Sequence, residues 1–283
     1  MIEPLLSVLL MGMIPVWGLS SGSQDTAQMT IAPPLTITGS LRLEQSLTAS
    51  GVIVVDLASA QTLFERRSTV ERPMASLTKL MTALIIIEHH NLTEIVTIPK
   101  DIEQTVGQSE HLPPGDKFTV GDLLSALLIA SSNDAAVALA RFHSGTVAAF
   151  ATVMNDRAKT LGLLHTSYVN PIGLDAPLQR STPHDLAWLA MFVLRSPQIA
   201  LRMGTPDTQI TSLAGKVIPL IHTHAMLHED SFVIAGKTGT TDAAGQCLLS
   251  IVEVKKKRYV VVLLHSRDRY ADMQRILAAL ARI

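Results

Sequence analysis

"PMASLTKLMTALIIIEHH", residues 73–90, sets a serine and a lysine three positions apart at the head of an apolar helix. The side chains after Lys79 are hydrophobic nearly all round the helix, which predicts that the helix is buried. Residues i and i+3 share a helix face, so Lys79 should lie beside Ser76. Burial lowers the pKa of a lysine from about 10.4, and a neutral amine next to a hydroxyl is a base next to a nucleophile.

The same stretch allows a purely structural interpretation. Ser76 could cap the helix, and Lys79 could extend its charge outward to water. The Ser-x-x-Lys pattern also occurs by accident in many proteins. The choice between the two interpretations therefore depends on the rest of the chain.

The composition is that of a protein with a sizeable core. The chain has 283 residues, of which 47% are hydrophobic and 17% charged, so it can form one large domain or two interleaved lobes. A net charge of -1 and an isoelectric point near 6.8 give no electrostatic support for nucleic acid binding. The only basic run, "KKKR" at 255–258, lies between two strand-like runs and predicts a hairpin turn.

Cysteine and histidine usage argues against a metal or cofactor. Cys247 is the single cysteine and begins an apolar run, which predicts a buried thiol and excludes an intramolecular disulfide. His222, His224 and His228 cluster in "HTHAMLH", but no cysteine or acidic residue stands there at zinc-like spacing. We predict no metal site and no cofactor.

The N-terminal segment indicates export. No residue from Pro4 to Gln24 is charged, and "LLSVLLMGMIPVWGL" is typical of the apolar region of a secretory signal. We interpret residues 1–22 as signal-like and residues 23–46 as a linker. Glu3 is the only charged residue before the apolar region, so the expected positive charge at the start is missing.

An uncleaved membrane anchor is the alternative for the same segment. Its 21 uncharged residues are enough to span a bilayer. Gly12, Pro15 and Gly18 argue against a regular spanning helix. Any membrane association is predicted through this segment only.

The remaining sequence predicts one α/β domain over residues 47–283. "SGVIVVDLASAQTLFERR" reads as a hairpin before the Ser76 helix, and strands return in "SFVIAGKTG", "QCLLSIVEV" and "RYVVVLLHS". Helical periodicity dominates in between. We predict an antiparallel sheet flanked by helices (47–99 and 226–283) with an all-helical lobe inserted (100–225). The C-terminal helix should cover the sheet with one apolar stripe: Met273, Ile276, Leu277, Leu280 and Ile283.

Two further polar clusters interrupt the apolar runs. "IASSNDAA" offers Ser131 and Asn133 just before a helix and would by itself be a helix cap. "AGKTGTTDAAG" offers Lys237, Thr238 and Thr240 between glycines and would by itself be a flexible strand end. Together with Ser-x-x-Lys, however, they complete the three elements of penicillin-binding proteins and class A β-lactamases, in the same order.

The chain resembles the low-molecular-mass D-alanyl-D-alanine carboxypeptidase and endopeptidase family of penicillin-binding proteins. The resemblance covers roughly residues 48–270 and includes "ASLTKLMTA", "LPPGDKFTVGDLLSALLIASSNDAA", "MNDRAKTLGLLHTSYVNPIGL" and "KTGTTDAAGQCL". It implies a β-lactamase/transpeptidase-like fold and a serine peptidase that acts on peptidoglycan stem peptides and binds β-lactam antibiotics. It also implies a location in the periplasm or cell envelope.

The resemblance assigns three catalytic residues. Ser76 would attack the carbonyl of a D-Ala-D-Ala bond, and Lys79 would accept its proton. Ser131, held by Lys79 and Lys237, would relay a proton to the leaving amine. Whether the enzyme is a carboxypeptidase or an endopeptidase stays open.

The resemblance also assigns the substrate-binding residues. Asn133 would bond the substrate's amide backbone, and Lys237 with Thr238 and Thr240 would receive the terminal carboxylate. The backbone N–H groups of Ser76 and Thr240 would meet the oxyanion. The chain departs from relatives at residues 222–224, where His-Thr-His replaces a frequent Asn-Thr-Asn.

Two alternatives share the fold. A β-lactamase commonly uses a glutamate between the second and third elements to activate water, and the sequence has no glutamate between Glu110 and Glu229. A non-catalytic β-lactam sensor would be expected to lack Lys79, Ser131 or Lys237, and all three are present. The peptidase hypothesis is therefore favoured.

Overall fold

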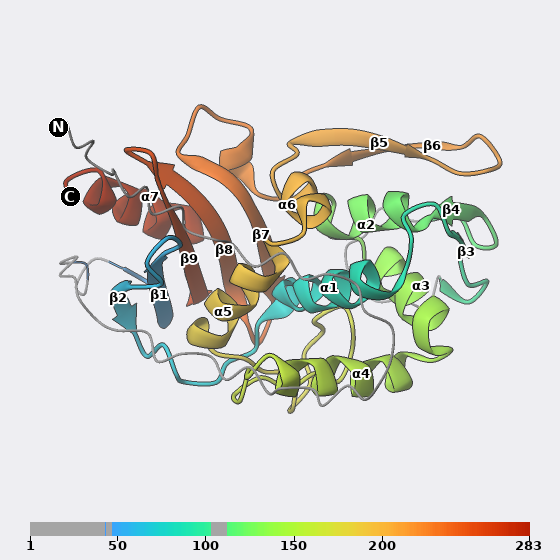
Figure 1. Ribbon diagram of the computed structural model, residues 1–283, viewed down its shortest axis with the longest axis horizontal. Helices are drawn as coiled ribbons and strands as arrows, with labels where there is room; N and C mark the ends of the chain where they lie inside the picture. Colours follow the sequence, from blue (N-terminus) through green and yellow to red (C-terminus); the bar gives the residue numbers. More distant parts are fainter. Residues whose placement is uncertain (1–42, 44–46, 103–111) are drawn as a thin grey trace, which may run out of the picture.

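A five-stranded antiparallel sheet forms one side of the molecule (Figure 1). The computed structural model describes residue 43, residues 47–102 and residues 112–283. The sheet order is β2-β1-β9-β8-β7, which brings strands from both ends of the sequence together at its centre. The bounds are β1 Gly51–Asp56, β2 Thr62–Arg66, β7 Val233–Thr241, β8 Gly245–Val254 and β9 Lys257–Ser266.

The predicted turns and hairpins of this sheet are confirmed. β1 pairs with β2 in antiparallel register, and the β8–β9 turn falls on Lys255 and Lys256 within the basic run. Both lysines have positive φ, 51° and 64°, in the left-handed region that tight hairpin turns require. The charge of this run therefore lies at an exposed turn.

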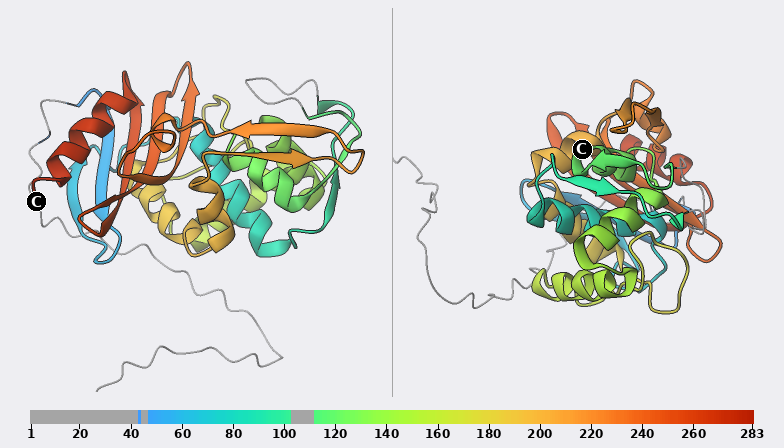
Figure 2. Two further views of the ribbon diagram at one scale, coloured as in Figure 1. Left: turned by 90° about the horizontal axis from the view of Figure 1, so that it is seen from above. Right: turned by 90° about the vertical axis from the view of Figure 1, so that its right-hand side faces the viewer.

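The sheet is buried on both faces. Successive residues of a strand point to opposite faces, and the residues on both faces are apolar. Ile53 and Val55 point into a core shared with α1 (Lys79–His89) and α5 (Pro183–Val193), whereas Val52 and Val54 point into a second core under α7 (Arg269–Leu280). The left-hand view of Figure 2 shows α7 and the helical lobe on opposite sides of the sheet. Of the predicted α7 stripe, the four residues inside the helix are buried, but Ile283 lies beyond the helix end and is 63% exposed.

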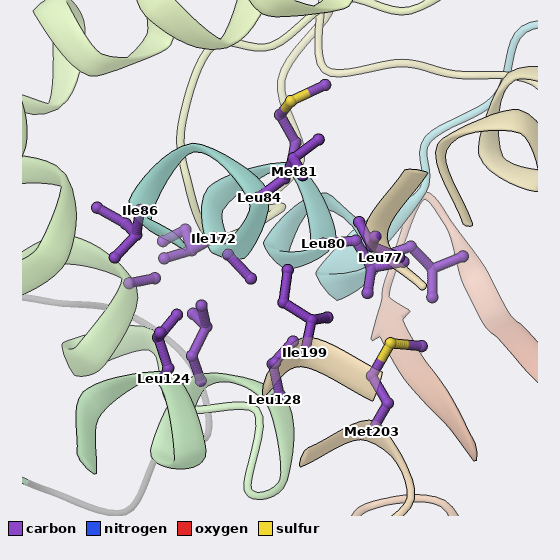
Figure 3. Close-up of a cluster of buried hydrophobic side chains, with 14 of the residues drawn as sticks. Leu77, Leu80, Met81, Leu84, Ile86, Leu124, Leu128, Ile172, Ile199 and Met203 are labelled. Carbon is purple, nitrogen blue, oxygen red and sulfur yellow. The ribbon is translucent and has the colours of Figure 1, made fainter. Parts of the chain in front are cut away.

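The inserted lobe is built around α1, which lies at its centre next to the sheet (Figure 1). Leu80 and Leu84 of α1, Leu124 and Leu128 of α2, and Ile199 of α6 belong to one hydrophobic cluster (Figure 3). The helices are α1 Lys79–His89, α2 Val120–Leu128, α3 Asn133–Ser144, α4 Val147–Thr160, α5 Pro183–Val193 and α6 Pro197–Met203. Because α1 is buried on nearly all sides, residues at its start are fixed by the core.

The prediction that residues 100–225 are all-helical is wrong in detail. β3 (Ile95–Thr97) pairs with β4 (Lys117–Thr119), and β5 (Asp207–Thr211) pairs with β6 (Val217–Ile221). Along β6, burial alternates from residue to residue, which is the two-residue period of a strand covering a core with one face. The β5–β6 hairpin leads straight into the 222–224 loop.

The signal-like segment, and all of the predicted linker except Leu43, lie outside the described residues. Among the helices of the described part, none alone is long and apolar enough to cross a membrane. The α3–α4 pair meets that test by length and composition only when taken together, and it is bent by 84°.

Candidate active site

The first motif places a buried amine beside a hydroxyl. Lys79 Nζ donates to Ser76 Oγ at 2.9 Å, to Asn133 Oδ1 at 2.7 Å and to the carbonyl of Ile172 at 3.2 Å. Lys79 is 0% exposed, so its charge does not extend to water. Ser76 is not a cap either, because Thr78 occupies the N-cap position of α1. The catalytic interpretation of Ser-x-x-Lys is therefore the one that the geometry supports.

Two glycines let the backbone close tightly around Ser76. Ser76 lies in the 3₁₀ turn Ala75–Thr78 that leads into α1. A Cβ atom on Gly239 would lie 2.7 Å from the Ser76 backbone nitrogen, and one on Gly173, where φ is 93°, would lie 2.0 Å from the Ala75 carbonyl oxygen. Neither position tolerates a side chain. Ser76 is thus held between β7 and the loop that contains Gly173.

The two serines of the second motif, Ser131 and Ser132, make different contacts. Ser132 caps α3 by accepting a hydrogen bond from the Ala135 N–H. This leaves the Ser131 hydroxyl to face the other two motifs: Lys237 Nζ donates to it at 2.7 Å, and Lys79 Nζ lies 3.5 Å away. Ser131 has a φ of 60°, an uncommon conformation for a residue other than glycine. Such strain is often found at functional sites.

The third motif lies inside β7 and not at a loose strand end. Lys237 is 0% exposed, and its Nζ also donates to the Thr238 carbonyl at 2.9 Å. β7 is an edge strand, and its residues 238–241 line the cavity at the site. Ser131 contacts both lysines, so the structure places the three motifs next to one another.

The pKa values of both lysines are depressed. Burial lowers the pKa of Lys79 to about 7. The pKa of Lys237 is held well below its usual range, first by burial and then by the positive charges of Lys79 and Arg269. At neutral pH a substantial fraction of Lys79 is a free base. A substrate carboxylate beside Lys237 would act in the opposite direction, because a nearby negative charge favours the ammonium form.

The motifs open onto a cavity of about 380 Å³. Five of the predicted site residues line it, while Lys79 and Lys237 are buried behind Ser76 and Ser131. The lining residues are Ser76, Ala130, Ser131, Asn133, Ile172, Gly173, Leu174, Thr223, Thr238, Gly239, Thr240, Thr241 and Arg269. This lining contains no carboxylate.

Arg269 is a lining residue that the sequence did not reveal. It starts α7, yet its Nη1 donates to Thr240 Oγ1 at 3.0 Å and to the Gly239 carbonyl at 2.9 Å. It supplies a positive charge at the end of the cavity where the carboxylate of a substrate is expected. The local sequence around Arg269 reads as an ordinary helix start, so only the three-dimensional packing places it here.

Other reactive groups near the site are occupied or shielded. Asp175 uses its two carboxylate oxygens to accept from Thr241 Oγ1 at 2.6 Å and from the Ala243 N–H at 3.0 Å. Cys247 is buried as predicted, and burial raises its pKa to about 11. Within residues 47–102 and 112–283, no group of three or more His, Cys, Asp or Glu side chains could hold a metal ion.

A sequence profile of the D-alanyl-D-alanine carboxypeptidase family matches residues 39–268 and so spans all three motifs. The chain belongs to this family. It is 30% identical over 237 residues to the D-alanyl-D-alanine carboxypeptidase DacF of Bacillus subtilis, covering 81% of this chain and 61% of the relative. It is 29% identical over 242 residues to the D-alanyl-D-alanine endopeptidase of Escherichia coli, covering 82% and 77%.

Solved structures of a DD-transpeptidase and a D-alanyl-D-alanine carboxypeptidase share the fold. A point mutant of the Streptomyces K15 DD-transpeptidase superposes with a TM-score of 0.80 at 27% identity, covering 84% of this chain and 99% of that one. A D-alanyl-D-alanine carboxypeptidase from Mycobacterium tuberculosis gives 0.77 at 27% identity, covering 90% and 96%. The predicted sheet with an inserted helical lobe is therefore the fold of the family.

Proposed function

We propose that the protein is a serine DD-peptidase that cleaves next to D-alanine in peptidoglycan stem peptides, as a carboxypeptidase or an endopeptidase. The observation that carries the proposal is the fully buried Lys79 amine, 2.9 Å from Ser76 Oγ and with a pKa of about 7. A neutral amine in that position can accept the hydroxyl proton. Family membership and the cavity over Ser76 support the same conclusion.

Acylation starts when Ser76 Oγ attacks the carbonyl of the D-Ala-D-Ala bond and its proton moves to Lys79 Nζ. The backbone N–H groups of Ser76 and Thr240 stabilise the oxyanion, and each such donor contributes about 3 kcal/mol. Ser131 relays a proton to the leaving amine, and the C–N bond breaks. Water then hydrolyses the ester on Ser76 and regenerates the hydroxyl.

Substrate recognition would use the polar side chains of the second and third motifs. Asn133 bonds the amide backbone of the stem peptide, while Lys237, Thr238 and Thr240 bind the terminal carboxylate. Arg269, bonded to Thr240 Oγ1, adds a further positive charge on this side. Hydrogen bonds between charged partners are about twice as strong as neutral ones, which suits a small anionic group as the main anchor.

The proposal extends to location and partners. A peptidoglycan substrate requires an exported protein, in the periplasm or cell envelope, and the uncharged stretch of residues 4–24 is consistent with export. Association with a membrane would involve the N-terminal segment only. β-Lactam antibiotics, which also present an acyl group and a carboxylate, are expected ligands, and nucleic acid is not.

Digestion of purified peptidoglycan tests the proposed activity. We expect the wild-type protein to release free D-alanine or to separate cross-linked dimers, and the fragments identify which of the two it does. The measurement is chromatography and mass spectrometry of the digest. A folded protein that reacts with penicillin but releases neither product would instead be the non-catalytic sensor.

Slow loss of a bound β-lactam is expected, because the cavity lining has no carboxylate to activate water. The leaving amine of an opened β-lactam stays tethered and blocks the approach from its own side. A penicilloyl adduct should therefore persist for minutes or longer, measured as release of labelled penicilloate after excess drug is removed. Turnover at many cycles per second would favour the β-lactamase alternative.

A further inference from the structure

The loop at residues 222–224 forms part of the wall of the cavity. Thr223 lines it, and its Oγ1 lies 2.6 Å from Thr238 Oγ1. The Thr223 N–H donates to the Ile129 carbonyl at 3.1 Å, and the Tyr270 hydroxyl donates to the Thr223 carbonyl at 3.2 Å. Thr223 is therefore bonded to the end of α2, to β7 and to α7, and it lies on the carboxylate side of the site.

His224 fixes this loop from behind. A Cβ atom on Gly236 would lie only 2.5 Å from His224 Cδ2, so the imidazole packs directly on the β7 backbone, one residue before Lys237. His224 Nε2 lies 2.7 Å from Ser250 Oγ on β8, the strand position that pairs with Gly236. The ring is fully buried. Moving it would displace Thr223 on one side and the Lys237 backbone on the other.

The surroundings of His224 favour a neutral ring. Burial lowers the pKa of His224 to about 4, with further contributions from the positive charges of Arg269, Lys237 and His228. His222, from the same loop, has its pKa lowered to about 3, and its Nδ1 accepts a hydrogen bond from the backbone N–H of His224. The ring of Tyr270 on α7 lies 5.7 Å from that of His224. His224 thus stays uncharged wherever the enzyme works near neutral pH.

We propose that His224 is a positioning residue that sets Thr223 and Lys237 for the substrate's terminal carboxylate. The proposal rests on the DD-peptidase function and assigns a role to a loop in which the chain departs from the frequent Asn-Thr-Asn. His224 touches no reacting atom. Its loss should therefore weaken binding of carboxylate-bearing ligands and leave the reactivity of Ser76 unchanged.

Acylation kinetics with benzylpenicillin, which carries a carboxylate, test this role. In His224→Ala we expect the dissociation constant of the initial complex to rise about tenfold, as for a lost charged hydrogen bond, with the limiting acylation rate preserved. His224→Asn, whose neutral amide can still bond Ser250, should restore most of the affinity. His165→Ala removes an exposed imidazole beside Glu71 and serves as the matched control with wild-type kinetics.

A neutral arylboronic acid, which bonds a nucleophilic serine but has no carboxylate, reports whether the site is intact. Its affinity should be unchanged in His224→Ala. Equal losses of boronic acid and penicillin binding, or an unchanged dissociation constant for penicillin, would overturn the proposal. If His224→Ala fails to fold, Ser250→Ala keeps the ring, removes its anchor, and should give a smaller shift in the same direction.

These measurements are separate from the test of the function itself. Wild-type acylation by benzylpenicillin does not depend on peptide hydrolysis, so the His224 comparison can be made even if peptidoglycan is not cut. A wild-type protein that is never acylated would contradict the proposed function. A wild-type protein that is acylated, with a His224→Ala variant that behaves identically, would contradict the positioning role alone.

Discussion

Replacement of Ser76 by alanine should abolish the covalent adduct that labelled penicillin forms with the wild-type protein. The buried Lys79 amine aims at Ser76 Oγ from 2.9 Å, and without that oxygen no acyl-enzyme can form. Peptidoglycan cleavage should fall by at least about 10³-fold, as expected when a covalent nucleophile is removed. The measurement is mass spectrometry of the intact protein after incubation with the drug.

A neighbouring serine provides the matched control. Ser132→Ala removes the hydroxyl that caps α3, so we expect a loss of about 1 kcal/mol in stability with the adduct retained. The pair distinguishes loss of the nucleophile from general damage to the site. An adduct of the same mass in Ser76→Ala would show that another side chain is acylated and would contradict the assignment.

Acylation should also depend strongly on pH. Because the pKa of Lys79 is about 7, the neutral fraction of this base, and with it the acylation rate, should fall about 50-fold between pH 7 and pH 5. Above pH 8 the rate should level off. Rapid-mixing measurements with a chromogenic β-lactam across this range would give the profile. His222 and His224, with pKa values of about 3 and 4, contribute little above pH 5.

The lowered pKa of Lys79 also determines whether the free energy of unfolding rises or falls with pH. The folded-state pKa of Lys79 lies below the unfolded value of about 10.4, so the unfolded state binds more protons in between. Lys79 therefore lowers the free energy of unfolding as pH falls from about 10.4 to about 7, with no further change below.

A flat acylation profile from pH 5 to pH 9 in the folded protein would rule out Lys79 as the base.

The sequence predicted the site best where chemistry is encoded locally. Ser76 and Lys79 share one helical turn, and burial of α1 follows from its composition, so their contact was predictable. The convergence of Ser131 and Lys237 came from resemblance to a family, because nothing in the spacing of distant segments dictates a 2.7 Å contact.

The parts that were missed depend on long-range packing. Arg269 reaches the cavity from α7, and its partners, Gly239 and Thr240, are distant in sequence. The sequence pattern predicts helix where the short β5–β6 hairpin lies, because a five-residue strand gives a weaker periodic signal than the helices around it. The contacts of His224 likewise join the loop after β6 to β7 and β8.

The pairing of β1 with β9 determines when, during synthesis and folding, the protein can become active. Gly51 pairs with Leu264, so the centre of the sheet cannot form until synthesis has passed Leu264. Contacts this distant in sequence form slowly, because a long loop must close first. Lys237 lies on β7 of this sheet and bonds Ser131, 106 positions away in the sequence, so the third motif meets the first two only when the sheet has formed. A nascent or unfolded chain is therefore expected to be catalytically silent, and hydrolysis begins only once folding has finished.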